Sequence, residues 1–444
     1  MRVIVTILLV LLLTLPAIAQ APAPPAPRPL GLAEAIAMAL QQNQQLRVSA
    51  FEVAIARAQL AQARGAKAPQ INGQASVTRT QEAQATTIGF LAHGELHTIV
   101  IPPGSPNLYD ARVTLQYPLY TGGALEAQIA LAEANVRGAE ATLERIKQQI
   151  VFAARQAYFQ LQLAQSGLEV TERSVAQANE NLRVARARVA AGASPRFDEV
   201  QADVALATAL QSRVRARNAI AQSMQALAGV LNLPLTTPLR LTDAFTVRPV
   251  RETADALVAR AVQARPELAE LAARQAAAQA GIELARSGAR PNLALQASGA
   301  YSNTGGLFAG SSGSTSWSVT LAATLNLFDG GVTRERVREA ELRLEQLRAI
   351  EAQQKQGVEL EVRQAYINLQ SAAEELAGAD ALIAQAQEAL RIANVRFQSG
   401  VGTNLEVLNA QTAASQAEAG KVEALFNYNL ARATLERAVG ADLP

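Results

Sequence analysis

The segment from His93 to His97 (HGELH) carries both histidines of the chain, at a spacing found in metal-binding motifs. Two histidines four residues apart can share a metal ion when they lie on one face of a helix. Gly94 and the nearby Pro102 and Pro103 favour a loop instead. We therefore expect a surface loop here, with no metal ion and no cofactor.

The amino-acid composition excludes most other kinds of catalytic site. Cysteine is absent from the 444 residues, which excludes disulfides, thiolate metal sites and cysteine nucleophiles. Both histidines lie in one expected loop, so few residues could serve as the base of a catalytic triad. We therefore expect no catalytic residues and no enzyme. The 40 basic and 38 acidic residues leave a formal net charge of +2, and no basic tract indicates a nucleic-acid surface.

Two carboxylates occupy equivalent places beside glycine-containing turns. Asp198 lies six residues after Gly192, and Glu406 lies six residues after Gly400. Each acid therefore falls in the first turn of the helix that follows, where the helix dipole favours negative charge. Helix-end electrostatics alone is the simpler interpretation of both residues. A ring of such carboxylates around a symmetry axis would instead attract cations.

The elements that would position these acids occur twice. Tyr120–Gly123 (YTGG) reappears 208 residues later as Phe328–Gly331 (FDGG), and Arg155–Tyr158 (RQAY) reappears as Arg363–Tyr366. A constant offset over this distance indicates an internal duplication. We expect strand-to-helix turns at Gly122, Gly123, Gly330 and Gly331. The expected layout is a first structural repeat over residues 31–232, a connector over 233–252 and a second repeat over 253–440.

Each repeat carries long helical signals. A helical segment is expected over residues 32–66 and again over 254–287, each ended by a glycine and a proline. No proline interrupts 124–193 or 332–402, where apolar or small residues recur at alternating steps of four and three. This heptad pattern predicts coiled coils, and each rod would span roughly 100 Å. A glycine turn ends each rod before another helix, so we expect two antiparallel helical hairpins.

Short segments of alternating polarity adjoin the helices. Strands are expected over about residues 70–79, 111–120, 292–302 and 315–328. Such alternation is typical of strands that face lipid on one side and a lumen on the other. Aromatic residues gather in or near these strands and are expected to form a membrane-boundary belt: Tyr117, Tyr120, Tyr301, Trp317 and Phe328. A soluble sheet with aromatic core residues is the alternative interpretation.

The first residues resemble a targeting signal. Arg2, the apolar run Val3–Leu15 and the small residues of Pro16–Ala19 predict a cleaved signal peptide over residues 1–19. No cysteine follows the cleavage site, so we do not expect lipidation. Residues 20–30 form a Pro/Ala leader, for which a linker without function is the simpler interpretation.

Four strands per chain are too few to close a membrane barrel. An open strand edge in lipid leaves backbone groups unpaired at several kcal/mol each. Two chains would supply eight strands and three would supply twelve; eight leave an interior filled by side chains, whereas larger barrels enclose a lumen. The expected inward set, made largely of Ser, Thr, Asn, Gln and Ala, suits a wet lumen, so we expect a homotrimer.

The duplicated layout, the two glycine turns and Gly402–Gln411 (GTNLEVLNAQ) resemble the TolC-type outer-membrane efflux proteins, or outer membrane factors. The resemblance implies a mostly α fold with a small membrane β part. A twelve-stranded trimeric barrel would lie in the outer membrane of a Gram-negative bacterium, above a twelve-helix periplasmic tunnel. It implies the exit duct of a tripartite efflux system for small molecules, drugs or metals. Its partners would be a periplasmic adaptor and an inner-membrane pump of the RND, ABC or MFS type.

Three alternatives to efflux remain open. Within the family, the chain could instead be the duct of a type I protein secretion system. Outside it, the alternatives are a secreted coiled-coil rod without a pore and, as the weakest, a metal hydrolase built on His93 and His97.

The resemblance also implies a tunnel entrance at the hairpin tips, ringed by acidic side chains. Glu406 matches the first acid of the second hairpin, and Asn409 stands where the family prototype has another. Asp198 matches an acid that forms a lock with a basic residue, but Asn404 stands at the basic position, so the lock would lack its charged form. The tip residues expected to contact the adaptor are Gly192, Gly400, Val401, Gly402 and Thr403.

Overall fold

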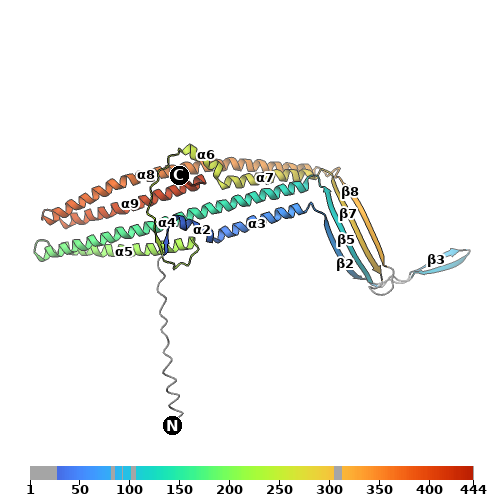
Figure 1. Cartoon of the computed structure of the whole chain (residues 1–444), viewed down its shortest axis with the longest axis horizontal. Helices are drawn as coiled ribbons and strands as arrows, with labels where there is room; N and C mark the ends of the chain where they lie inside the picture. The colour runs from blue at the N-terminus through green and yellow to red at the C-terminus, as the bar shows by residue number, and fades with distance from the viewer. Residues whose placement is uncertain (1–27, 82–85, 93, 102–106, 305–312, 444) are drawn as a thin grey trace, which may run out of the picture. The chain divides into compact units, whose positions relative to one another are not determined.

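The computed structural model describes residues 28–81, 86–92, 94–101, 107–304 and 313–443, which Figure 1 draws in colour. These residues form two compact units. The first unit contains the described residues up to Gln44, Lys147–Leu257 and those from Val362 onward. The second contains the described residues of Gln45–Ile146 and Val258–Glu361. The expected signal peptide and most of the expected leader lie outside the described residues.

Two pairs of helices form the hairpins expected from the sequence (Figure 1). α4 (Ala124–Ala190) turns back into α5 (Arg196–Val230), and α8 (Val332–Gln398) turns back into α9 (Asn404–Val439). α4 and α8 have 67 residues each, which corresponds to roughly 100 Å, so the prediction of uninterrupted helices is confirmed. Among the described residues, no helix has the length and apolar character that crossing a membrane requires.

Small residues pack inside each hairpin of the first unit. The buried clusters are Leu182, Ala185 and Ala202 between α4 and α5, and Ala386, Ala414 and Ala417 between α8 and α9. Alanine at these places lets the two helix backbones approach closely, in agreement with the heptad pattern of the sequence.

The shorter helices differ from the sequence prediction at one point in each repeat. Residues 32–66 form α2 (Leu32–Gln42) and α3 (Gln44–Gly65), and residues 254–287 form α6 (Ala254–Ala264) and α7 (Pro266–Ser287). Asn43 and Arg265 break the helices with extended ψ angles of 122° and 124°. At Arg265 the cause is the proline that follows, which disfavours helical angles in the residue before it.

Four antiparallel strands form one sheet in the second unit (Figure 1). In spatial order they are β2 (Gln70–Arg79), β5 (Asn107–Tyr120), β7 (Asn292–Thr304) and β8 (Ser314–Thr324). β8 ends at Thr324 and not near residue 328, so Phe328 lies beyond the strand. Thr324 is paired with Asn292, the first residue of β7. The residue before Asn292 is Pro291, which has no N–H to extend the hydrogen-bond ladder.

A short parallel pair joins two segments for which no strand was expected. β1 (Arg28–Leu30), at the end of the expected leader, pairs with β6 (Leu239–Leu241), inside the expected irregular connector. Leu30 is fully buried, and its carbonyl oxygen accepts a hydrogen bond from the Tyr158 hydroxyl at 3.2 Å. Three-residue strands are too short for a periodic signal, so only the long-range contact reveals them.

The prediction of a loop around the histidines is wrong for most of its length. β3 (Thr86–Ala92) and β4 (Glu95–Ile101) form an antiparallel hairpin, and His97 lies in β4 opposite Phe90. Gly94 has a φ of 87°, which a tight turn between the strands accommodates. His93 lies outside the described residues. Within the described part of the chain, no group of three His, Asp or Glu residues could hold a metal ion.

Candidate functional site: a two-faced sheet and the tips of two helical hairpins

The four-stranded sheet has one apolar and one polar face. Its register aligns Ile71, Leu115, Ala297 and Val319 in one row across the strands. The next row, on the opposite face, contains Asn72, Thr114, Ser298 and Ser318. Ile71 is 70% exposed and Val319 is 62% exposed, so the apolar face is not covered by the rest of the described chain. The hydroxyls of Ser298 and Ser318 lie 2.9 Å apart on the polar face.

The aromatic residues singled out in the sequence fall into two groups. Tyr301 and Trp317 lie on the apolar face toward the turn between β7 and β8, and Trp317 is 83% exposed. Tyr117, Tyr120 and Phe328 lie toward the helix ends of the strands, and Phe328 is 88% exposed. Tyr117 is half-buried and the other four rings are exposed, and the membrane-boundary belt stays a prediction.

The turns from strand to helix depend on glycine and on side-chain capping. Gly122, Gly123, Gly330 and Gly331 all have positive φ angles, between 64° and 91°. A Cβ atom on Gly122 would lie 2.8 Å from the Cβ of Arg290. The Asp329 carboxylate accepts hydrogen bonds from the backbone N–H groups of Gly331 and Thr333 at 3.0 and 2.8 Å. Hydrogen bonds from the hydroxyl and the N–H of Thr333 hold the pKa of Asp329 below its usual value.

The hairpin tips in the first unit are glycine turns followed by a helix start. Gly192 and Gly400 have φ angles of 70° and 85°, which glycine adopts without strain. A Cβ atom on Gly402 would lie 2.9 Å from the backbone N of Phe397, so this position also needs a residue without a side chain. The Thr403 hydroxyl caps α9 by accepting from the Glu406 N–H at 3.3 Å.

The predicted entrance acids have different surroundings. Glu406 forms an ion pair with Arg396 of α8, with its Oε2 3.4 Å from Nε, and both side chains are about half exposed. Asn409, one turn further along α9, is exposed. Asp198 is half-buried. Arg396 was not predicted as a site residue, because its pairing with Glu406 arises only when the chain reverses at Gly400.

An uncharged contact stands at the position where the sequence resemblance implied a charged lock. Asn404 is 1% exposed, and its Nδ2 donates to the backbone carbonyl of Asp198 at 3.1 Å, not to the carboxylate. Its Oδ1 has no hydrogen-bond partner in the described part of the chain. The tie between the two hairpins here is therefore a side chain to backbone hydrogen bond.

Arg188 makes a second tie between the hairpins, which sequence reasoning missed. Its Nη1 donates to the carbonyl oxygen of Phe397 at 2.7 Å, and its guanidinium lies 4.7 Å from the centre of the Phe397 ring. Its Nε donates to the Ser194 hydroxyl at 3.2 Å. A basic residue in the last turn of α4 was the available signal, but its partner on α8 is 209 residues away.

A sheet that is apolar on one exposed face and polar on the other, continued along the chain by long helical hairpins, defines a membrane channel protein. Comparison with known proteins agrees. A family model described as "Outer membrane efflux protein" matches residues 35–233 and 257–441. The chain is 27% identical to outer membrane protein OprJ of Pseudomonas aeruginosa over 412 residues, 90% of this chain and 81% of that protein.

Two further comparisons agree with this match. The chain is 26% identical to the outer membrane efflux protein BepC of Brucella suis over 405 residues, 90% of this chain and 82% of BepC. The crystal structure of a membrane protein from Pseudomonas aeruginosa superposes with a TM-score of 0.77 at 25% identity, covering 92% of this chain and 93% of that one. The chain belongs to the outer membrane efflux protein family, and its location is the outer membrane with an extension into the periplasm.

Proposed function

We propose that three copies of this chain form the exit duct of a tripartite efflux system, together with a periplasmic adaptor and an inner-membrane pump. The observation that carries the proposal is the two-faced sheet with open edges. In the described residues, β2 and β8 each pair on one side only. Backbone groups left unpaired in lipid cost several kcal/mol each, so the open edges must meet the edges of other copies.

The internal duplication indicates how the edge strands of two copies would pair. Within one chain the two repeats join where β5 pairs with β7, with Leu115 opposite Ala297. β8 is the equivalent of β5 in the second repeat, at an offset of 208 residues. β7 is the equivalent of β2, at an offset of 222 residues, which is the distance from Pro69 to Pro291. The same contact between copies places Ala323 of one copy opposite Ala75 of the next.

This register matches the chemistry of both faces. On the apolar face it places Leu321 opposite Val77 of the next copy. On the polar face it places Thr320 opposite Thr78 and Thr324 opposite Gln74. A slip of one residue would put apolar side chains of one strand beside polar side chains of the other. The apolar face then continues around a closed twelve-stranded wall, and the polar face lines the lumen.

The helices of the second unit support the same arrangement. Within the chain α7 packs on α4, where Ala273 lies beside Gly138. The equivalent contact between copies places Phe51 of α3 beside Gln346 of α8. Phe51 is 62% exposed, and Leu342, one turn from Gln346, is 61% exposed. A neighbouring copy would cover both apolar side chains.

The hairpin tips supply the entrance in this proposal. Three copies of Glu406 and Asp198 around a threefold axis would form an acidic constriction, with Asn404 and Asn409 beside it. The adaptor would contact the exposed turns that contain Gly192, Gly400, Val401, Gly402 and Thr403. We also propose that the two repeats span residues 31–232 and 253–440, joined by the connector over 233–252. A cleaved signal peptide over residues 1–19 would precede them.

Efflux is preferred to protein secretion as the task of the duct, because BepC is named for efflux. Relatives named for cation efflux and for toluene efflux add support for exported small solutes. Deleting the gene is expected to sensitise cells to toxic small compounds. Unchanged tolerance together with loss of a secreted protein would favour the type I secretion alternative.

Disulfide trapping tests the trimer directly, because the chain has no cysteine of its own. The double variant Ala75→Cys/Ala323→Cys is expected to give covalent dimers and trimers in outer membranes after mild oxidation. Ile71→Cys/Ala323→Cys, four residues out of register, is the matched control and is expected to stay uncrosslinked, because its Cβ atoms lie too far apart. A monomeric protein outside the membrane fraction would overturn the proposed function.

A further inference from the structure

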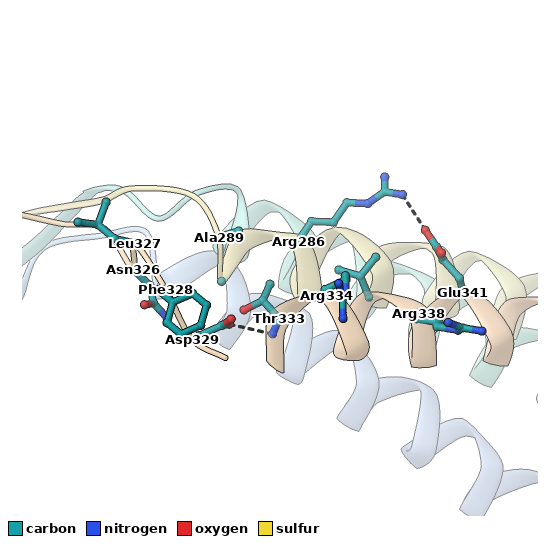
Figure 2. A pocket seen from close by; sticks show the side chains of 12 residues that line it. Arg286, Ala289, Asn326, Leu327, Phe328, Asp329, Thr333, Arg334, Arg338 and Glu341 are labelled. Carbon is teal, nitrogen blue, oxygen red and sulfur yellow. Dashed lines mark hydrogen bonds and ion pairs between the residues drawn. The ribbon is translucent and has the colours of Figure 1, made fainter. Parts of the chain in front are cut away.

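A cavity of about 700 Å³ borders the turn between β8 and α8 (Figure 2). One wall is apolar and contains Leu327 and Phe328, which are 89% and 88% exposed. The other side carries three guanidinium groups, from Arg286 of α7 and from Arg334 and Arg338 of α8. An apolar wall beside clustered cations suits an amphiphile with an anionic head.

The carboxylates of this cavity are already engaged. Asp329 accepts from the N–H groups of Gly331 and Thr333, as described above. Glu341 accepts from Arg286 Nη2 at 3.0 Å, and Figure 2 shows this pair at the far side from Asp329. Arg338 makes no hydrogen bond or ion pair with another described residue, and Arg334 binds its exposed neighbour Glu335 through Nε, at 3.1 Å. Guanidinium N–H groups therefore remain available to a ligand.

Comparison of the two repeats shows that this site has diverged. The pair Arg64–Glu133 of the first repeat, at 2.8 Å, corresponds to Arg286–Glu341 of the second and is retained. The neighbouring pair Lys67–Glu126, at 2.6 Å, is not retained, because Ala289 and Arg334 stand at the corresponding positions. Arg338 further replaces an alanine, Ala130. The second repeat has thus exchanged a closed ion pair for two adjacent cations.

We propose that this cavity binds the headgroup of an anionic phospholipid from the periplasm-facing leaflet, of the phosphatidylglycerol type. The inference rests on the proposed function, which places the end of β8 at that membrane boundary. Arg334 and Arg338 would hold the phosphodiester through paired N–H donors, since guanidinium matches phosphate geometry. The acyl chains would lie on Leu327 and Phe328 and then along the exposed apolar face of β8. One lipid would bind beside each second repeat and none beside each first repeat.

Lipid retention on the purified full-length protein tests the proposal. Native mass spectrometry would compare phosphatidylglycerol, phosphatidylethanolamine and inorganic phosphate as added ligands. Wild type is expected to retain up to three phosphatidylglycerol molecules per trimer. Arg334→Gln/Arg338→Gln is expected to retain at least about tenfold less, because each cation near an anionic lipid contributes to its retention. Arg336→Gln/Arg343→Gln, on the same helix but outside the cavity, is the charge-matched control and is expected to behave as wild type.

Where wild type is a membrane trimer, four results would overturn the inference alone. The cavity variant could retain phosphatidylglycerol as well as wild type does. Phosphatidylethanolamine could be retained equally well, or inorganic phosphate could bind as tightly as the lipid, which would make this a site for free anions. The cavity variant could also dissociate into monomers, which would identify the cavity as a subunit contact. If wild type itself is not a membrane trimer, the proposed function fails as well, so the two failures are distinguished by the mass of the wild-type assembly.

Discussion

At the scale of single residues, the hairpin tips show how side chains join segments that lie far apart in the sequence. Arg188 binds the carbonyl of Phe397, and Asn404 binds the carbonyl of Asp198. Both hydrogen bonds run to backbone oxygens, and Arg188 adds a contact with the Phe397 ring, whose centre lies 4.7 Å from the guanidinium. Glu406 is different, because its carboxylate is paired with Arg396 and remains about half exposed. In the proposed duct, it is therefore the tip residue whose charge would act on a permeating ion.

Substitutions of this ion pair are expected to change ion selectivity in opposite directions. Glu406→Ala removes one carboxylate per copy from the proposed entrance, and the cation-to-anion permeability ratio should fall about threefold. Arg396→Ala frees the same carboxylate, so the ratio should rise by a similar factor. Planar bilayer recordings at low salt would measure both ratios. Equal ratios in wild type and Glu406→Ala would remove Glu406 from the entrance.

At the scale of elements, the junctions between strands and helices are specified by capping chemistry. The second repeat uses Asp329, whose carboxylate caps α8, whereas the first repeat uses the hydroxyl of Thr121, which accepts from the Leu125 N–H at 3.2 Å. Positive φ angles at Gly330 and Gly331 turn the chain between the strand and the capped helix. The two junctions have the same geometry with different caps, and only the second cap is charged.

The charged cap should make the second junction sensitive to acid. The pKa of Asp329 is held below its usual value of 3.8, because Thr333 binds the ionised form. Its stabilising effect is therefore fully present above that usual value and is lost as the pH falls through the lowered one. Thermal unfolding of wild type and Asp329→Asn should differ at pH 7, and the difference should shrink as the pH falls below 3.8. Thr121→Val is the control, and its effect should not change over this range.

At the scale of the whole molecule, the exposed apolar surface of one chain favours contact with another copy or with lipid. Phe51, Leu342 and Trp317 are each more than 60% exposed in one chain, on surfaces that the proposed arrangement covers with another copy or with lipid. The contact between the two repeats and the contact between copies would then be versions of the same interface. A duplicated chain needs half as many copies to close a ring of a given size.

A charge placed in the proposed contact should weaken assembly. Phe51→Asp is expected to destabilise the trimer by about 3 kcal/mol per subunit contact, through lost apolar burial and a buried carboxylate. Analytical ultracentrifugation in detergent would measure the monomer fraction. Leu235→Asp, at an equally exposed position in the connector, should leave the trimer intact. A stable trimer of Phe51→Asp would contradict the proposed packing of α3 on a neighbouring α8.

The sequence by itself determined the duplication, the long hairpins, the four-stranded sheet with its two faces and the glycine turns. These features are local or periodic, so each window of residues carries its own signal. Tertiary structure alone decided the pairing of β1 with β6, the hairpin around His97, the ties made by Arg188 and Asn404, and the cavity beside Arg334. Each of these depends on where the backbone brings particular atoms. Apart from the local hairpin, these contacts join residues that are tens to hundreds of positions apart. A periodic pattern predicts a local helix or strand, but it does not predict which distant segments come into contact.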